Sequence, residues 1–174
     1  MAYDISLATA EDLDGIAALL QANAPSGGGA LTGEFPREKV EKMAFNGMPV
    51  VVARKAGRVV GILFSSAKGN PVSSVRAMLK AWPGDADAYV YGPVCIADTE
   101  RGQGLLAKLY AVLQAHCANR EGVLFIEQSN VASIRAHERL GMRAVAEYLF
   151  EGRAYFVFSD GRQAKQRRPI SSAS

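Results

Sequence analysis

The sequence predicts a mixed α/β fold, and two observations carry this prediction. Between residues 88 and 140, strand-like apolar runs alternate with helix-like stretches, a pattern typical of parallel strands joined by helical connections. Elsewhere, β-rich segments flank short turns such as KAGR at residues 55–58, which predicts antiparallel hairpins. We therefore expect a single domain over residues 1–160, with a mixed, mostly antiparallel sheet of about seven strands flanked by helices.

The first part of the chain predicts a strand, a helix, a mobile loop, a second helix and a hairpin, over residues 3–9, 9–23, 24–35, 36–47 and 49–67. The strand is indicated by alternating apolar and polar residues. Thr9 is a suitable N-cap, and acidic residues crowd the turn that follows it. Glycines dominate the loop, and Pro36 suits the start of the second helix.

The second part predicts a short helix, a long strand, a helix, a strand, a helix and a strand pair, over residues 70–84, 85–98, 104–122, 123–130, 131–141 and 144–161. Gly92 and Pro93 lie inside the long strand, where proline lacks the amide donor, so we expect weakened pairing or a bulge there. His116 falls at helical spacing with the apolar residues of its helix, which predicts a buried, non-catalytic histidine.

Composition limits the classes of partner. The net charge is +3, but four of the positive charges lie in a predicted basic, flexible tail at residues 161–174, and the rest of the chain carries −1. We therefore expect a solvated terminus and no nucleic-acid partner. Apolar runs are too short to span a bilayer and no signal pattern is present, so we expect a cytoplasmic protein without membrane contact. The two histidines offer no spaced metal cluster, and Cys95 and Cys117 are expected to be buried thiols.

One short motif carries chemistry. Residues 99–106 read TERGQGLL and join the long strand to the next helix. The first amides of a helix lack partners within it and carry partial positive charge, so they suit a phosphate. Gly102 and Gly104 would let the backbone approach a pyrophosphate, and Arg101 could add charge. The segment lacks the GK[ST] of a nucleotide-triphosphatase loop and the third glycine of a dinucleotide loop. By itself it also fits a plain tight turn.

A second segment, NVASIRAHERLGM at residues 130–142, opens the next helix after a strand. With this segment the chain resembles the GNAT acyltransferase superfamily, which transfers acyl groups from acyl-coenzyme A to amines. The family's phosphate turn, Arg/Gln-x-x-Gly-x-Gly/Ala, corresponds to residues 101–106, with Leu106 as a departure from the small final residue. Its later motif corresponds to Asn130, Ser133, His137, Glu138, Gly141 and Met142. The resemblance covers about residues 3–158 and implies a splayed central pair of parallel strands.

The resemblance implies acetyl-CoA as the cofactor. Main-chain groups of Val94, Cys95 and Ile96 would bind the pantetheine arm, and Asn130 and Ser133 would contact the pantetheine or its thioester end. The pyrophosphate would lie on the backbone of the turn, formed by Arg101, Gly102, Gln103, Gly104, Leu105 and Leu106.

The catalytic assignments are more open. In many relatives a tyrosine at the position of His137 protonates the departing thiolate, and histidine can donate a proton near neutral pH. Packing without catalysis is the other possibility for His137. Glu127 is the first candidate for the base that deprotonates the amine and Glu34 the second, unless they are ordinary carboxylates. Glu34, Phe35, Tyr89 and Tyr91 are candidates for the acceptor site, and the aromatic residues among them equally suit a core.

Three functional hypotheses follow. The leading one is an acetyltransferase whose primary-amine acceptor, a small molecule or a peptide, attacks acetyl-CoA directly in a ternary complex. The second is a non-catalytic module that binds coenzyme A or acyl-CoA for regulation, because the tyrosine is missing and the turn is imperfect. The third is a nucleic-acid-binding domain that uses the basic tail. The final strands often pair between subunits in this family, so a homodimer is a further expectation.

Overall fold

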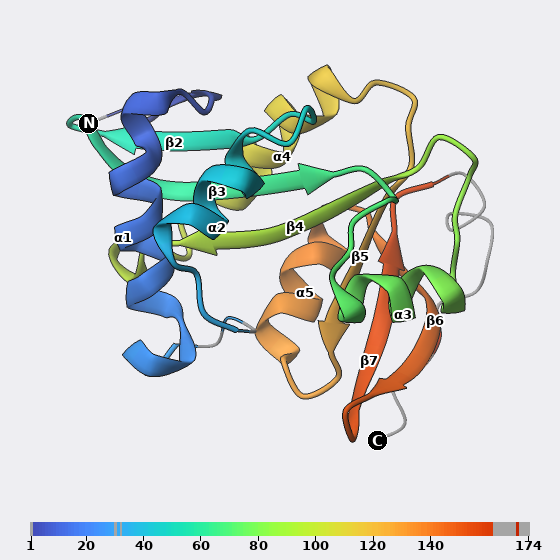
Figure 1. Ribbon diagram of the computed structural model, residues 1–174. Coiled ribbons are helices and arrows are strands. Elements are labelled where there is room, and N and C mark those ends of the chain that lie inside the picture. Colours follow the sequence, from blue (N-terminus) through green and yellow to red (C-terminus); the bar gives the residue numbers. More distant parts are fainter. Residues whose placement is uncertain (1, 30, 32, 162–169, 171–174) are drawn as a thin grey trace. The chain divides into compact units, whose positions relative to one another are not determined.

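The computed structural model describes residues 2–29, 31, 33–161 and 170. Most of the predicted tail, including Arg162, Lys165, Arg167 and Arg168, lies outside the described residues. The helices and strands follow in the predicted order (Figure 1). They are β1 (Asp4–Leu7), α1 (Leu13–Asn23), α2 (Arg37–Ala44), β2 (Val51–Lys55), β3 (Arg58–Ser66), α3 (Ser73–Ala81), β4 (Tyr89–Ile96), α4 (Leu105–His116), β5 (Gly122–Glu127), α5 (Val131–Arg139), β6 (Arg143–Phe150) and β7 (Arg153–Ser159). Short 3-10 turns lie at Ala10–Asp12, Pro25–Gly27 and Asp98–Glu100.

The strands form one seven-stranded sheet in the order β1-β2-β3-β4-β5-β7-β6. The central pair is parallel, with Tyr89 opposite Gly122 and Val90 opposite Val123. The pairs β1–β2, β2–β3, β5–β7 and β6–β7 are antiparallel. The predicted mixed, mostly antiparallel sheet with a parallel central pair is therefore confirmed.

The described residues form two compact units, the first within residues 1–66 and 92–118 and the second within residues 67–91 and 119–174. Strand β4 contributes to both, because the division falls between Tyr91 and Gly92. A single domain over residues 1–160 stays a prediction.

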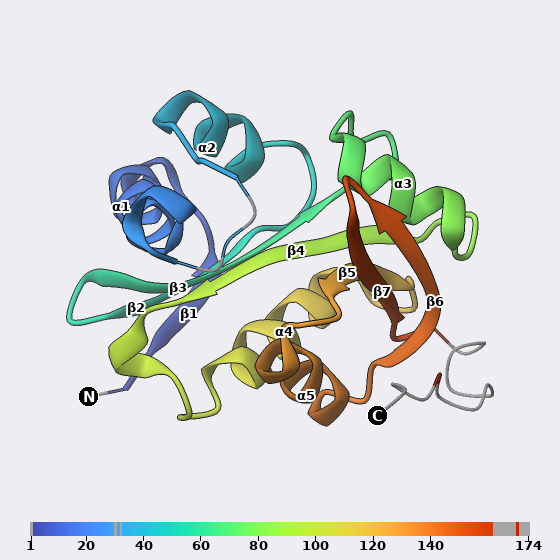
Figure 2. The same cartoon turned by 90° about the horizontal axis from the view of Figure 1, so that it is seen from below.

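In the first unit, α1 and α2 cover one face of strands β1–β3 and α4 covers the other (Figure 2). The α4 side is closely packed, because a Cβ built on Gly61 of β3 would lie 3.2 Å from Leu105 and 3.3 Å from Leu109. The opposite face holds a buried apolar core whose members include Ile16, Leu20, Val40, Val52, Ile62 and Phe64.

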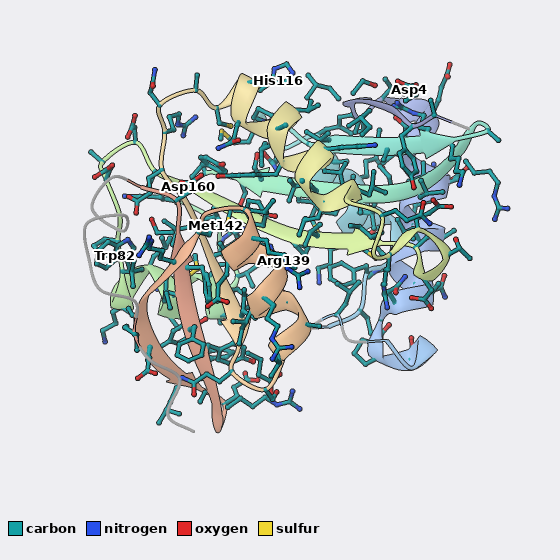
Figure 3. All side chains as sticks on the ribbon, turned by 180° about the vertical axis from the view of Figure 1, so that it is seen from behind. Asp4, Trp82, His116, Arg139, Met142 and Asp160 are labelled. Atoms are coloured by element: carbon teal, nitrogen blue, oxygen red, sulfur yellow. The ribbon has the colours of Figure 1, made fainter. Side chains whose placement is uncertain are left out.

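In the second unit, α3 packs on β5 and β6 over a core that includes Val75, Met78, Val90, Val123, Val145 and Val157. A buried carboxylate, Glu121, joins three segments just before β5. Glu121 accepts hydrogen bonds from Trp82 Nε1 at 2.9 Å, from the Asp85 amide at 2.6 Å and from the Ser159 hydroxyl. Close to β5, the carboxylate of Asp160 accepts a hydrogen bond from the Gly122 amide at 2.7 Å; Asp160 and Trp82 are labelled in Figure 3.

The expectation of a loop without any regular element after α1 is wrong at Pro25–Gly27, whereas its mobility stays a prediction. Pro25–Gly27 forms a 3-10 turn, and the amides of Gly27 and Gly29 both donate to the Ala24 carbonyl at 2.9 Å. Glycine serves close approach here, because a Cβ built on Gly29 would lie 1.9 Å from the Asn23 carbonyl oxygen. The glycine-rich sequence therefore permits a hydrogen-bonded turn at this position.

The predicted burial of His116 is wrong, since this residue is exposed at the end of α4 (Figure 3), and its non-catalytic role stays a prediction. The helix ends there, and the buried position falls on Cys117 instead. The prediction for the thiols is confirmed, because Cys95 and Cys117 are both buried and outside any disulfide.

The irregularity expected within β4 is present. The Tyr89 amide donates to Glu121, on the β5 side, whereas the Ala97 amide donates to Val60 of β3. In a regular strand, residues of the same parity direct their backbone groups to the same edge. The register therefore changes within β4, where Gly92 has a φ of +99°.

Candidate active site

The end of β4 offers backbone groups on one edge. Since the Ala97 amide bonds to β3, the alternating pattern directs the Cys95 backbone toward β3 and the backbones of Val94 and Ile96 toward the other edge. The Cys95 side chain is buried, its thiol donates to the Leu19 carbonyl, and burial raises its pKa to about 11. Of these three predicted cofactor residues, Val94 and Ile96 therefore have the geometry to offer main-chain hydrogen bonds.

The turn between β4 and α4 has an open backbone. Gly102 and Gly104 have φ angles of +73° and +75°, in the left-handed region that favours glycine. Among the described residues, a Cβ built on either glycine meets nothing within 4 Å, and no side chain caps α4 at its N-cap residue, Gly104. The first amides of α4 therefore retain the donors and partial positive charge that a phosphate group requires. The residues present fit a pyrophosphate.

The same turn is held by side chains from the residue before β1 and from the end of β2. Glu100, at the start of the turn, accepts the Tyr3 hydroxyl at 2.5 Å and the Lys55 ammonium at 3.1 Å. The hydrogen bond from Tyr3, with a further contribution from Lys55, lowers the pKa of Glu100. The side chain of Gln103 donates to the Thr99 carbonyl at 3.2 Å. Sequence patterns missed this brace, because its partners lie far apart in the chain.

Arg101 bonds to protein groups on three sides. Its Nε donates to the Ile96 carbonyl at 3.2 Å, Nη2 donates to Asn23 Oδ1 at 2.9 Å, and Nη1 pairs with Asp98 at 2.8 Å. The side chain thus joins the turn to the last residue of α1. If the guanidinium of Arg101 contacts a phosphate, as the sequence predicts, that contact competes with its bonds to these three protein groups.

His137 lies in the buried part of the second unit, with 2% of its surface exposed. Nδ1 lies 2.8 Å from the Ser133 carbonyl oxygen, and Nε2 lies 3.1 Å from the Tyr91 hydroxyl. A carbonyl only accepts, so Nδ1 carries the proton, and in the neutral ring Nε2 accepts from Tyr91. Burial lowers the pKa of His137, despite the backbone hydrogen bond at Ser133, so the neutral form dominates near pH 7.

Asn130 and Ser133 lie at the start of α5, in the same unit. Asn130 is the N-cap, and its Oδ1 accepts the Ser133 amide at 3.2 Å. The Ser133 hydroxyl lies 3.3 Å from His137 Nδ1. The structure therefore brings together Tyr91, His137, Ser133 and Asn130, which the sequence analysis assigned to three different roles.

The two candidate bases both have partners. Glu127, at the end of β5, pairs with Arg153 at 3.2 Å, and its side chain is 32% exposed. Glu34 accepts hydrogen bonds from the Ser26 amide at 3.0 Å and from the Ser26 hydroxyl at 2.8 Å, so its carboxylate is bonded to the turn after α1.

The aromatic candidates for the acceptor site are buried. Phe35 belongs to the core of the first unit, with Lys39 Nζ 4.4 Å from the centre of its ring. Tyr89 is 1% exposed and packs on Gly122, and burial raises the pKa of Tyr91 far above its ordinary value. For these residues the structure agrees with the alternative of core packing.

Two further findings concern the described residues as a set. They contain no group of His, Cys, Asp and Glu side chains that could hold a metal ion. Within the same residues, every helix is too short or too polar to cross a membrane.

Three solved structures share this fold. The yncA protein of Salmonella typhimurium, solved with its cofactor acetyl-CoA, has 19% identity and a TM-score of 0.68, with 100% of both chains covered. The phosphinothricin acetyltransferase of Sinorhizobium meliloti, in complex with acetyl-CoA, has 20% identity and a TM-score of 0.69, with 98% of this chain and 94% of that chain covered. The ribosomal-protein-alanine N-acetyltransferase of Brucella melitensis has 21% identity and a TM-score of 0.65, with 90% and 98% covered.

Comparison with curated proteins found no match. A model of the acetyltransferase (GNAT) family matches residues 16–142, which include the turn, Asn130, Ser133 and His137. This span is more than half of the 174 residues and confirms the resemblance drawn from the sequence. The chain belongs to the GNAT family of acetyltransferases.

Proposed function

We propose that the protein transfers an acetyl group from acetyl-CoA to a primary amine, by direct attack of the amine in a ternary complex. One observation carries this proposal, the open glycine turn at the start of α4, whose N-cap makes no side-chain hydrogen bond. The turn follows β4, in which the backbone groups of Val94 and Ile96 point away from β3. Membership of the family and the acetyl-CoA found in two proteins of the same fold support it.

The proposed binding roles follow from the backbone. The amides of residues 101–106 hold the pyrophosphate, and Val94 and Ile96 bond to the pantetheine arm as an added strand would. Asn130 and Ser133 contact the pantetheine or its thioester end. When bound, acetyl-CoA supplies the acetyl group as an activated thioester.

The proposed chemistry relies mainly on positioning. Holding two reactants in a suitable geometry can supply about 7 to 11 kcal/mol of the barrier. Glu127 takes the proton from the amine, directly or through water, and its ion pair with Arg153 holds the carboxylate in place. His137 holds the Tyr91 hydroxyl through its unprotonated Nε2, and this arrangement favours a positioning role over that of an acid.

The proposal is tested by following the release of coenzyme A thiol from acetyl-CoA. The assay uses a panel of amino acids, polyamines, amine-bearing antibiotics, lysine peptides and peptide N-termini. We expect turnover with at least one amine class. Binding of acetyl-CoA without turnover on the whole panel would instead support the regulatory module, which the neutral histidine in place of a tyrosine also favours.

His137→Phe distinguishes the two roles of His137. The substitution removes the hydrogen bond between Nε2 and the buried Tyr91 hydroxyl, so we expect a loss of about 0.5 to 1.5 kcal/mol in unfolding free energy. We expect turnover to slow by less than about tenfold, with the affinity for acetyl-CoA unchanged, because general acid catalysis contributes about 100- to 10,000-fold. Tyr91→Phe is the matched control, since it removes the same hydrogen bond from the other side. If His137→Phe alone slowed turnover by about 100-fold or more, the acid role would be restored.

A further inference from the structure

The segment that follows α1 is folded back onto the end of that helix. Asn23, the last residue of α1, is 9% exposed, and its carbonyl accepts the Leu31 amide at 3.1 Å. The Ala24 carbonyl accepts two amides of the same segment, those of Gly27 and Gly29. The order of residues 24–29 and of Leu31 therefore depends on the position of the end of α1.

The side chain of Asn23 connects this segment to the phosphate turn. Its Nδ2 donates to the Leu19 carbonyl at 2.9 Å, and its Oδ1 accepts Arg101 Nη2 at 2.9 Å. Because Asn23 is almost fully buried, loss of the arginine would leave a polar oxygen without this donor. The partner, Arg101, is the first residue of the turn proposed to hold the pyrophosphate.

The hydrogen bonds of Arg101 can transmit order from the turn to the end of α1, and from the end of α1 to the turn. Its Nε is fixed by the Ile96 carbonyl, so the guanidinium spans the end of β4, the turn and the end of α1. All of these groups belong to the first compact unit. An anion that orders the turn backbone would restrict Arg101 as well, and the restriction would pass to Asn23.

We propose that Arg101 is a positioning residue whose bond to Asn23 couples coenzyme A binding at the turn to the order of residues 24–29 and 31. This proposal rests on the proposed function, because it requires coenzyme A to bind at residues 101–106. Coupling between two sites is reciprocal, so loss of the link weakens coenzyme A binding by the same factor by which it removes the ordering. Couplings of this kind are about 5- to 150-fold.

The test compares amide hydrogen exchange with and without saturating coenzyme A. The full chain is used as wild type and as the variant Asn23→Leu, which removes the acceptor for Arg101. In the wild type we expect exchange at Gly27, Gly29 and Leu31 to slow at least about fivefold on binding, together with the turn amides. In Asn23→Leu we expect protection of the turn amides alone, and a Kd for coenzyme A that is at least about fivefold higher.

Three further variants make the test decisive. Asn23→Asp keeps an oxygen acceptor for Arg101 and is expected to restore the protection of Gly27, Gly29 and Leu31. Arg37→Gln removes an exposed pair with Asp14 near the start of α1 and is expected to behave as the wild type. If Asn23→Leu does not fold, Arg101→Lys replaces it, because lysine keeps the charge and lacks the planar fork.

Two results would overturn the proposal and they have different meanings. Protection of the turn without protection of Gly27, Gly29 and Leu31 in the wild type would overturn the coupling and leave the proposed function intact. Absence of coenzyme A binding to the folded wild type would overturn both.

Discussion

Gly104→Asp is expected to weaken the binding of acetyl-CoA by about a thousandfold while the protein stays folded. Gly104 is the N-cap of α4, and in the described part of the chain a Cβ at this position meets nothing within 4 Å, so there is space for an aspartate side chain. Its carboxylate would lie against the bound pyrophosphate. Two like charges about 4 Å apart repel by about 4 kcal/mol at an effective dielectric of about 20. That energy corresponds to about a thousandfold in Kd, which isothermal titration calorimetry would measure.

Two controls separate charge from backbone strain. Gly104→Asn has nearly the same shape without the charge, and asparagine tolerates a positive φ, so we expect at most about a tenfold rise in Kd. Gly57→Asp places an aspartate at a φ of +75° in the β2–β3 hairpin, away from the turn in sequence. We expect it to bind acetyl-CoA as the wild type does. Equal Kd values for Gly104→Asp and Gly104→Asn would remove the pyrophosphate from this turn.

Asp12→Ala destabilises the protein by about 3 kcal/mol, the cost of breaking a buried ion pair by removing one partner. The Asp12 carboxylate is buried and accepts two hydrogen bonds from the Arg54 guanidinium, through Nε at 2.6 Å and Nη2 at 2.5 Å. It also accepts the Thr9 amide at 2.7 Å and so caps the turn that precedes α1. For a domain of this size the melting temperature should fall by about 6 to 12 °C.

The stabilisation by Asp12 depends on pH. The hydrogen bonds from Arg54, with those from Thr9, lower the pKa of Asp12 in the folded state. A lowered carboxyl pKa stabilises the fold above the unfolded value, about 3.9, and the effect is lost as pH falls through the folded pKa. Melts of wild type and Asp12→Ala should therefore differ fully at pH 7 and converge in strong acid.

Asp14→Ala is the matched control for this prediction. Asp14 also pairs with an arginine, Arg37 at 2.9 Å, but its side chain is 85% exposed. Exposed pairs contribute about 0 to 1 kcal/mol, so its melting temperature should stay close to that of the wild type. If Asp12→Ala melts no lower than Asp14→Ala, the buried pair does not stabilise the first unit.

The elements and the turn could be predicted because their signals are local. Strand alternation, proline and glycine positions and the RGQG sequence each act within a few residues. The same local view failed at Pro25–Gly27, which form a 3-10 turn where the glycines predicted no regular element. It also failed at His116, where the helix ends and exposes the side chain.

The contacts that define the candidate site could not be predicted, because they join residues far apart in the chain. Tyr3 and Lys55 reach Glu100, and Asn23 reaches Arg101, without any pattern in the sequence that pairs them. The protonation state and tautomer of His137 could not be predicted either. The resemblance implied its place in the site, but its lowered pKa follows from burial and its tautomer from the Ser133 carbonyl. Both the pKa and the tautomer depend on the packing around α5.

The most direct test of the central claim is a thermal melt of the wild-type protein with and without acetyl-CoA. A ligand at about 100 times its Kd stabilises a protein by about 2.7 kcal/mol, which for a domain of this size is a rise of about 5 to 10 °C. We predict a rise of this size with millimolar acetyl-CoA and none with NAD or ATP. Folded protein whose melting temperature does not change with acetyl-CoA would contradict the account, since the turn before α4 would then hold no pyrophosphate.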